Sequence, residues 1–229
     1  MKKAIYEVSM TFTEPLLGGA CNNPEIHSEF IASKAPTVTE GQEETAALPE
    51  ETMEKALGVF PKDDKGLFYW NYQFRGFFKE QIAALVDIGE VNEVSKWSVK
   101  KAVNQLLYIT PRRVYLLDDK GRNIKESTSV LSRPLRAETL QGPRVALASS
   151  QVLPPGTQLV YTMTLIQAGN AKSKCKLSEP TLLAALEFGS QNGFGQWRTA
   201  HYGSFTYKMR LLEVMGTEQE TLEPSVQVK

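Results

Sequence analysis

The chain has 229 residues, which suffices for one domain with a sizeable hydrophobic core or for two small domains. Hydrophobic residues make up 41% and charged residues 23% of the chain, which is typical of a globular protein. Lys plus Arg and Asp plus Glu both total 26, so the formal net charge is zero and a polycation that coats nucleic acid is excluded. Any binding of nucleic acid would therefore need a local basic patch.

The first predicted element is a half-buried strand close to the N-terminus. Apolar and polar residues alternate from Tyr6 to Phe12, which is the pattern of a strand with one buried face. Pro15 cannot donate a ladder hydrogen bond and should end the strand. Gly18 and Gly19 then allow a sharp turn.

An acidic insertion follows at residues 22–60, with eight glutamates against two lysines. Its centre, residues 37–54, is rich in Thr, Glu, Gln and Ala, and is predicted to be partly disordered or a loosely packed hairpin with a short helix. A turn at residues 63–66 leads into an aromatic-rich, extended stretch at residues 67–74.

Three helices and four further strands are predicted in the remainder of the chain. The first helix is predicted to begin at Gly76. The second follows Ser95, its N-cap candidate, and the third starts near Pro180, after its N-cap candidate Ser178. The strands are predicted at residues 113–117, 142–152, 159–166 and 205–211. This order favours an α+β fold, an antiparallel sheet with helices on one face.

Basic residues gather in the middle of the chain. Residues 95–145 contain eleven Lys and Arg residues against four acidic ones. Such a segment can bind phosphates, because each neutralised phosphate releases counterions. It can equally be a solvated surface that balances the acidic insertion, and the sequence leaves both interpretations open.

The strongest candidate site is the glycine-rich loop at residues 189–203. Its glycines would let backbone N–H groups approach phosphates closely, while Trp197 or Tyr202 could stack a base and Arg198 could pair with a phosphate. Alternatively, the loop is a helix C-cap and a wide turn, with Trp197 in the core. The candidate residues are Gly193, Gly195, Gln196, Trp197, Arg198, His201 and Gly203.

Two other basic segments are candidate contacts for nucleic acid. Arg75 and Lys79 flank Gly76 where the first helix is predicted to start, and a helix N-terminus attracts anions. The second segment is predicted to be a basic, kinked loop that contains Arg133, Arg136 and Arg144. Such a loop could follow a nucleic-acid backbone. Both segments can also be solvated connections without a ligand.

No catalytic, metal or cofactor site is predicted. His27 and His201 could act as acid and base in metal-independent RNA cleavage, but neither lies in the H-x-[ST] pair of two-histidine phosphoesterases. Asp63 and Asp64 could hold Mg²⁺, although an acidic turn is the commoner role of such a pair. The sequence contains no P-loop, G-x-S-x-G, H-E-x-x-H or paired CxxC motif.

The compartment is predicted from the cysteines and the N-terminus. Cys21 and Cys175 are far apart and lack metal-ligand spacing, which favours reduced thiols in a cytoplasmic protein. The alternating N-terminal stretch is typical of a strand and not of a signal peptide. No apolar run reaches membrane-spanning length.

Four short stretches in a fixed order resemble the RAMP superfamily, most closely the backbone subunits of type III CRISPR effector complexes. Residues 13–19 (TEPLLGG) are similar to the T-P-L-x-x-G-G turn after the first strand of that family, with one inserted residue. Residues 66–79 are similar to the family's extended G-x-P-Y-I-P-G-S-S-x-K-G-x-x-R stretch, without its serine pair. Residues 154–157 (PPGT) match a P-x-G-T strand start, and residues 193–205 match the glycine-rich loop before the last strand.

The resemblance implies a single ferredoxin-like (RRM-like) domain over residues 1–212, with the acidic insertion at 22–60 and a flexible acidic tail at 213–229. It implies a noncatalytic RNA-binding module in a CRISPR-type or related ribonucleoprotein of antiviral defence, with RNA and other RAMP-like subunits or further copies of the chain as partners. The alternatives are a stand-alone or virus-encoded relative that inhibits CRISPR by protein contact, and a metal-independent endoribonuclease. Asp63 and Asp64 do not match the family's target-cleaving aspartate, so cleavage is not implied.

Overall fold

The structure is a computed structural model that describes residues 2–21, 57–139, 142–167 and 176–216. Within these residues it contains a main antiparallel sheet, a second sheet and three α-helices. The main sheet has the strand order β12-β1-β11-β8-β6-β5, and β7 also pairs with β11. Its strands are β1 (Lys2–Phe12), β5 (Lys62–Asp63), β6 (Gly66–Trp70), β7 (Leu107–Thr110), β8 (Arg113–Leu117), β11 (Gln158–Gln167) and β12 (Phe205–Met215).

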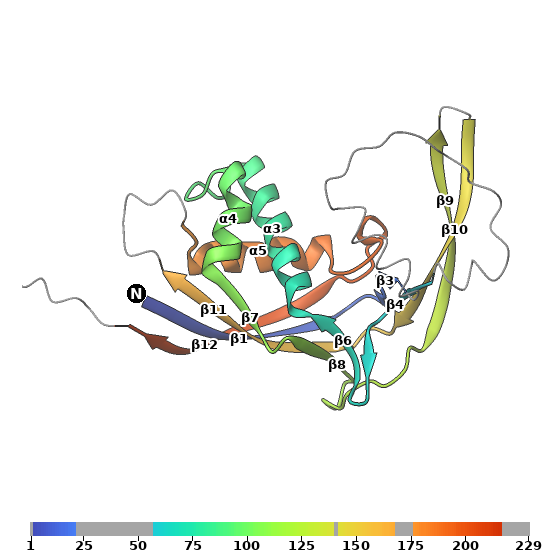
Figure 1. Cartoon of the computed structure of the whole chain (residues 1–229), viewed down its shortest axis with the longest axis horizontal. Coiled ribbons are helices and arrows are strands. Elements are labelled where there is room, and N and C mark those ends of the chain that lie inside the picture. The colour runs from blue at the N-terminus through green and yellow to red at the C-terminus, as the bar shows by residue number, and fades with distance from the viewer. Residues whose placement is uncertain (1, 22–56, 140–141, 168–175, 217–229) are drawn as a thin grey trace, which may run out of the picture.

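The helices cover one face of the main sheet, as Figure 1 shows. α3 (Asn71–Asp87) packs against both α5 (Glu179–Asn192) and α4 (Lys96–Leu106). Every second residue of β1 from Ala4 to Phe12 is buried, and β11 shows the same alternation. Since alternation buries one face of a strand, the helices lie on the apolar side of the sheet. The predicted α+β arrangement, an antiparallel sheet with helices on one face, is confirmed.

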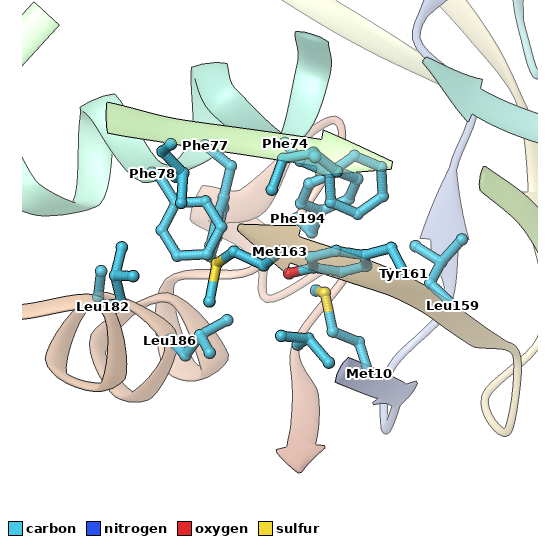
Figure 2. Close-up of a cluster of buried hydrophobic side chains, with 14 of the residues drawn as sticks. Met10, Phe74, Phe77, Phe78, Leu159, Tyr161, Met163, Leu182, Leu186 and Phe194 are labelled. Carbon is cyan, nitrogen blue, oxygen red and sulfur yellow. The ribbon is translucent and has the colours of Figure 1, made fainter. Parts of the chain in front are cut away.

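The hydrophobic core lies between the sheet and the helices (Figure 2). Phe74, Phe77 and Phe78 project into it from α3, and none of them is more than 6% exposed. The ring centroid of Phe74 lies 4.5 Å from that of Tyr161 on β11 and 5.1 Å from that of Phe194. Because Phe194 belongs to the loop after α5, this core contact fixes the start of the glycine-rich loop against α3.

The start of α3 differs from the prediction. The helix begins at Asn71, so Gly76 lies inside it and the stretch expected to be extended is partly helical. The side chain of Gln73 accepts a hydrogen bond from the backbone N–H of Trp70 at 2.8 Å, which closes the first turn. The amide side chain of Asn71 donates to the carbonyl oxygen of Ile109 at 3.0 Å and ties this turn to β7. These polar contacts, and the helical spacing of the core phenylalanines, outweigh the β propensity of the aromatic run.

The second sheet contains a long hairpin that projects from the main sheet (Figure 1). The prediction of a basic, kinked loop around Arg133 is wrong, because this segment is a strand, β9, that pairs with β10 in continuous register. Pro134 is tolerated because its strand pairs on one side only within the described residues, where a missing N–H costs little. The strands of this sheet are β2 (Leu16–Leu17), β3 (Ala20–Cys21), β4 (Gly58–Val59), β9 (Ser129–Thr139) and β10 (Gly142–Leu153).

Several predicted elements agree with the structure. β8 has the predicted bounds, and α4 begins directly after Ser95. α5 follows Ser178, whose hydroxyl oxygen accepts a hydrogen bond from the Thr181 N–H at 3.4 Å. The local signals for these elements, alternation and capping residues, are therefore sufficient to find them.

The acidic insertion and the tail lie mostly outside the described residues, as do Cys175 and His27. β12 continues to Met215, three residues into the segment predicted as tail. In the described part of the chain, none of the helices is long and apolar enough to cross a membrane.

Candidate nucleic-acid interface

The glycine-rich loop after α5 folds back tightly on itself. Gly193, Gly195 and Gly203 all have positive φ, at 84°, 88° and 74°. The N–H of Phe194 donates to the carbonyl oxygen of Gly203 at 2.8 Å, and a Cβ atom at Gly203 would lie 1.9 Å from the carbonyl oxygen of Phe194. The close approach of the two backbone strands of the loop therefore requires glycine at this position.

Two aromatic rings of the loop stack on each other, and an arginine from the hairpin joins them. The rings of Trp197 and Tyr202 are 5.0 Å apart and within 12° of parallel. The guanidinium of Arg133, on β9, lies 4.3 Å from the centroid of the Trp197 ring, a cation–π contact. Trp197 is half-buried, so it lies at the surface in this stack and not in the core.

Arg133 has unused hydrogen-bonding capacity. Its Nε and Nη1 atoms are shielded from solvent and have no hydrogen-bond partner among the described residues. Burial lowers the pKa of the Arg133 guanidinium, and the nearby Tyr202 hydroxyl opposes this change. An anion could supply acceptors to these two atoms only after the groups that cover them move aside.

A pocket of about 260 Å³ lies between α3 and the loop. Gln73, Gly76 and Phe77 line it from α3, and Gly195 and Gln196 line it from the loop. The turn after β1 contributes to the wall with a third glycine, Gly19. Of these three glycines, Gly76 leaves open space beside the main chain, because an added Cβ atom would have no neighbour within 4 Å, whereas Gly19 and Gly195 allow close packing of the pocket walls.

An ion pair spans the rim of this pocket. The Nη2 atom of Arg198 lies 2.6 Å from Oε1 of Glu80 on α3, and both residues line the pocket. The predicted phosphate contact of Arg198 therefore competes with an internal carboxylate. Glu80 is a site residue that the sequence prediction missed, because a helix start at Gly76 gave no reason to place its side chain beside the loop.

Arg75 and Lys79 lie on the other side of α3 from the pocket. Residues 73, 76, 77 and 80 share the pocket face of the helix, and residues 75 and 79 project about half a turn away from them. Burial lowers the pKa of the Lys79 ammonium, and the charges of Arg75 and Lys100 add to this effect. The structure thus separates these two predicted contacts from the loop and brings them to α4.

The other two predicted arginines belong to the hairpin. Arg136 pairs with Val145 and Arg144 pairs with Ala137 in the β9–β10 register. Their side chains lie outside the described part of the structure. Of the three arginines predicted in this segment, Arg133 is the one whose contact with the loop is described.

The structure describes one of the two histidines that are weaker catalytic candidates. His201 is exposed, with a φ of 62°, and its carbonyl oxygen accepts a hydrogen bond from the Ser204 hydroxyl at 3.1 Å. His27 lies outside the described residues. Among the residues that are described, no three His, Cys, Asp or Glu side chains come together as metal ligands would.

Asp63 holds a turn and a strand together. Its carboxylate oxygens accept hydrogen bonds from Arg113 at 2.7 Å, from the Tyr115 hydroxyl at 2.8 Å, and from the N–H groups of Lys65 and Gly66. Burial raises the pKa of Asp63, but these hydrogen bonds outweigh it and hold the pKa below its ordinary value. Four internal donors already engage this carboxylate, and the neighbouring Asp64 is exposed.

Comparison with known proteins gives little likeness in sequence. No protein-family model matches the chain, and no curated protein matches it. A solved structure described as the type III-B Cmr-beta bound to cognate target RNA is similar to 93% of this chain, with a TM-score of 0.41 and 11% identity. The chain spans 60% of the length of that protein chain.

Proposed function

We propose that this chain is a noncatalytic, single-stranded RNA-binding module of the RAMP type, working in the cytoplasm within a CRISPR-type or related ribonucleoprotein. The observation that carries the proposal is the pocket beside the glycine-rich loop, together with the stacked rings of Trp197 and Tyr202 on the same loop and Arg133 of β9 against them. Single-stranded nucleic acid binds to surfaces that combine stacking aromatic rings with cations along a groove.

The strand order supports a ferredoxin-like domain. The order β12-β1-β11-β7 is antiparallel, α3 lies between β1 and β7 in sequence, and α5 lies between β11 and β12. This is the β-α-β-β-α-β pattern of ferredoxin-like domains. α4 and the β9–β10 hairpin are then insertions into that pattern.

The position of the motif stretches also supports the proposal. The glycine turn at residues 13–19, the stretch at 66–79 and the loop at 193–205 are distant in sequence, yet all three contribute residues to one pocket. Close packing of these segments accounts for two of the glycines, because a Cβ atom at Gly195 would lie 3.2 Å from the carbonyl oxygen of Leu17 and one at Gly19 would lie 2.9 Å from the Gln196 side chain. Gly76 has no such neighbour within 4 Å, and a ligand that approaches the backbone would fit there.

The test is a fluorescence titration of the protein with labelled single-stranded RNA of about 5 nucleotides, a length within the range of small single-stranded sites. Arg133→Gln should weaken binding and lower the salt dependence of log K by about 0.7, one phosphate contact. Arg198→Gln should also weaken binding, because it leaves the Glu80 carboxylate without its partner at the rim of the pocket. Glu80→Gln should strengthen binding, because it releases Arg198 from its carboxylate partner.

A matched control is Arg122→Gln, which removes the same charge from an arginine paired with Asp118 in the turn after β8. It should leave binding unchanged. If the wild-type protein binds no RNA, or if Glu80→Gln and Arg122→Gln behave alike, the proposal is wrong. Failure to bind RNA together with stable capture of a protein partner would instead favour the inhibitor that acts by protein contact.

A further inference from the structure

α4 carries the most exposed large hydrophobic side chain among the described residues. Trp97, in the first turn of the helix, is 93% exposed and is absent from the residues that pack on the core. The ring exposes apolar surface to water in the folded chain and contributes nothing to the stability of the core. An exposed tryptophan ring offers a flat face on which a base can stack.

Lysines share this face of α4. Lys100 and Lys101 follow Trp97 by three and four residues, so the three side chains lie on the same side of the helix, and both lysines are exposed. The helix sequence, KWSVKKAVNQL, contains no acidic residue. Lys96 is paired with Asp87 at 2.6 Å, whereas neither Lys100 nor Lys101 has a salt bridge within the described residues.

α3 extends the cationic surface. Arg75 and Lys79 lie four residues apart on the side of α3 that faces away from the pocket, and Lys79 is close enough to Lys100 for their charges to repel. Because the partial burial of Lys79, and then the charges of Arg75 and Lys100, disfavour its charged form, the cluster has an electrostatic cost. A bound polyanion would offset the repulsion between these charges.

We propose that Trp97, Lys100 and Lys101, with Arg75 and Lys79 beside them, form a second contact surface for single-stranded RNA. This inference rests on the proposed function, since it takes the same strand that occupies the pocket and continues it across α3 to α4. The lysines neutralise backbone phosphates, and the exposed face of the Trp97 ring stacks a base.

The surface of α3 permits this path. Gly76 is exposed at the edge of the pocket, and a Cβ atom there would have no neighbour within 4 Å. The helix ridge is therefore low between the pocket and the cations at positions 75 and 79. A strand that leaves the pocket over Gly76 needs to cross one helix, about 10–12 Å wide, to reach them.

The chemistry of the surface favours nucleic acid over a protein partner. Lysine is depleted in protein–protein interfaces, whereas a stacking aromatic ring beside cations is typical of single-stranded nucleic-acid sites. The proposed path also continues directly from the pocket.

The experiment compares labelled single-stranded RNA of about 5 and about 16 nucleotides, two lengths that span the range of small single-stranded sites. Trp97→Ala should weaken binding of the longer RNA roughly tenfold, the effect of one lost stacked base, and should leave the shorter RNA unaffected. Lys100→Gln with Lys101→Gln should lower the salt dependence of log K for the longer RNA by about 1.4, two phosphate contacts.

The matched control is Lys120→Gln with Lys125→Gln, which makes the same change in charge at two exposed lysines in the segment after β8. This control should bind both lengths like the wild type. The α4 variants could bind the longer RNA as the wild type does while Arg133→Gln still weakens binding of the shorter RNA. In that case the proposed α4 surface is wrong and the proposed RNA site at the pocket is retained. If the wild type binds neither length, the proposed function fails and the α4 surface fails with it.

Discussion

The contact between α3 and α5 gives the sharpest prediction about stability. Gly189 of α5 faces Phe77 of α3, and a Cβ atom at Gly189 would lie 2.2 Å from Cζ and 2.7 Å from Cε2 of that ring. The ring cannot easily turn aside, because its centroid lies 5.5 Å from the rings of both Phe78 and Phe194 and 5.9 Å from the ring of Phe205. Gly189→Ala must therefore separate the helices or displace several rings.

The magnitude follows from two opposing terms. Overpacking of a filled core costs about 1–3 kcal/mol, and this overlap is severe enough to place the cost near the upper end. Replacing a glycine inside a helix by alanine returns about 0.5–1 kcal/mol. Gly189→Ala should therefore lower the free energy of unfolding by about 2 kcal/mol, which corresponds to a Tm decrease of about 4–8 °C for a domain of this size.

Gly76→Ala is the matched control, since it makes the same change inside α3 where no atom lies within 4 Å of the added Cβ. It should raise the free energy of unfolding by about 0.5–1 kcal/mol. Thermal unfolding followed by circular dichroism measures both variants. If Gly189→Ala is as stable as the wild type, the close packing of α3 on α5 is not as described. Because Phe77 also lines the pocket, the same variant should weaken RNA binding, whereas a loss of stability with unchanged binding would separate this contact from the site.

Two further predictions concern buried tyrosines. The Tyr161 hydroxyl is buried and has no hydrogen-bond partner among the described residues, whereas the Tyr69 hydroxyl donates to the carbonyl oxygen of Leu17 at 3.2 Å. In urea titrations, Tyr161→Phe should therefore stabilise the fold by about 1 kcal/mol, and Tyr69→Phe should destabilise it by a similar amount. Burial, and then the hydrogen bond to Glu179, raise the pKa of Tyr6 to about 12. The unfolded chain loses the Tyr6 proton first, near pH 10, so the free energy of unfolding should fall by up to about 1.4 kcal/mol per pH unit between pH 10 and about pH 12. Tyr6→Phe should make this decline shallower. An unchanged slope would contradict the raised pKa of Tyr6.

The parts of the fold that could be predicted are those specified by neighbouring residues. Alternation found β1 and β11, and the Ser178 cap with its proline found α5. These signals depend on burial of one face and on hydrogen bonds within one turn. They need no knowledge of what the element packs against.

The errors arose where a distant contact decides the local structure. The aromatic-rich stretch at residues 67–74 has high β propensity, but it becomes helical from Asn71, whose side chain donates to the carbonyl oxygen of Ile109. The segment around Pro134 is predicted to be a loop, but pairing with β10 holds this segment in a strand. Neither partner can be identified from the residues next to the one it controls.

Distant contacts also decide which residues of the candidate site can bind a ligand. They therefore determine how a chain of zero net charge could bind a polyanion. The sequence indicates which residues are cationic, but their charges become available to a ligand only through distant partners. Arg198 is held by Glu80, whereas Arg133, which stacks on Trp197, has two nitrogens without a partner in the described part of the chain. Binding strength should therefore depend less on the number of basic residues than on the few whose charge is not already paired. For this reason removal of one carboxylate, at Glu80, should change affinity as much as removal of a cation.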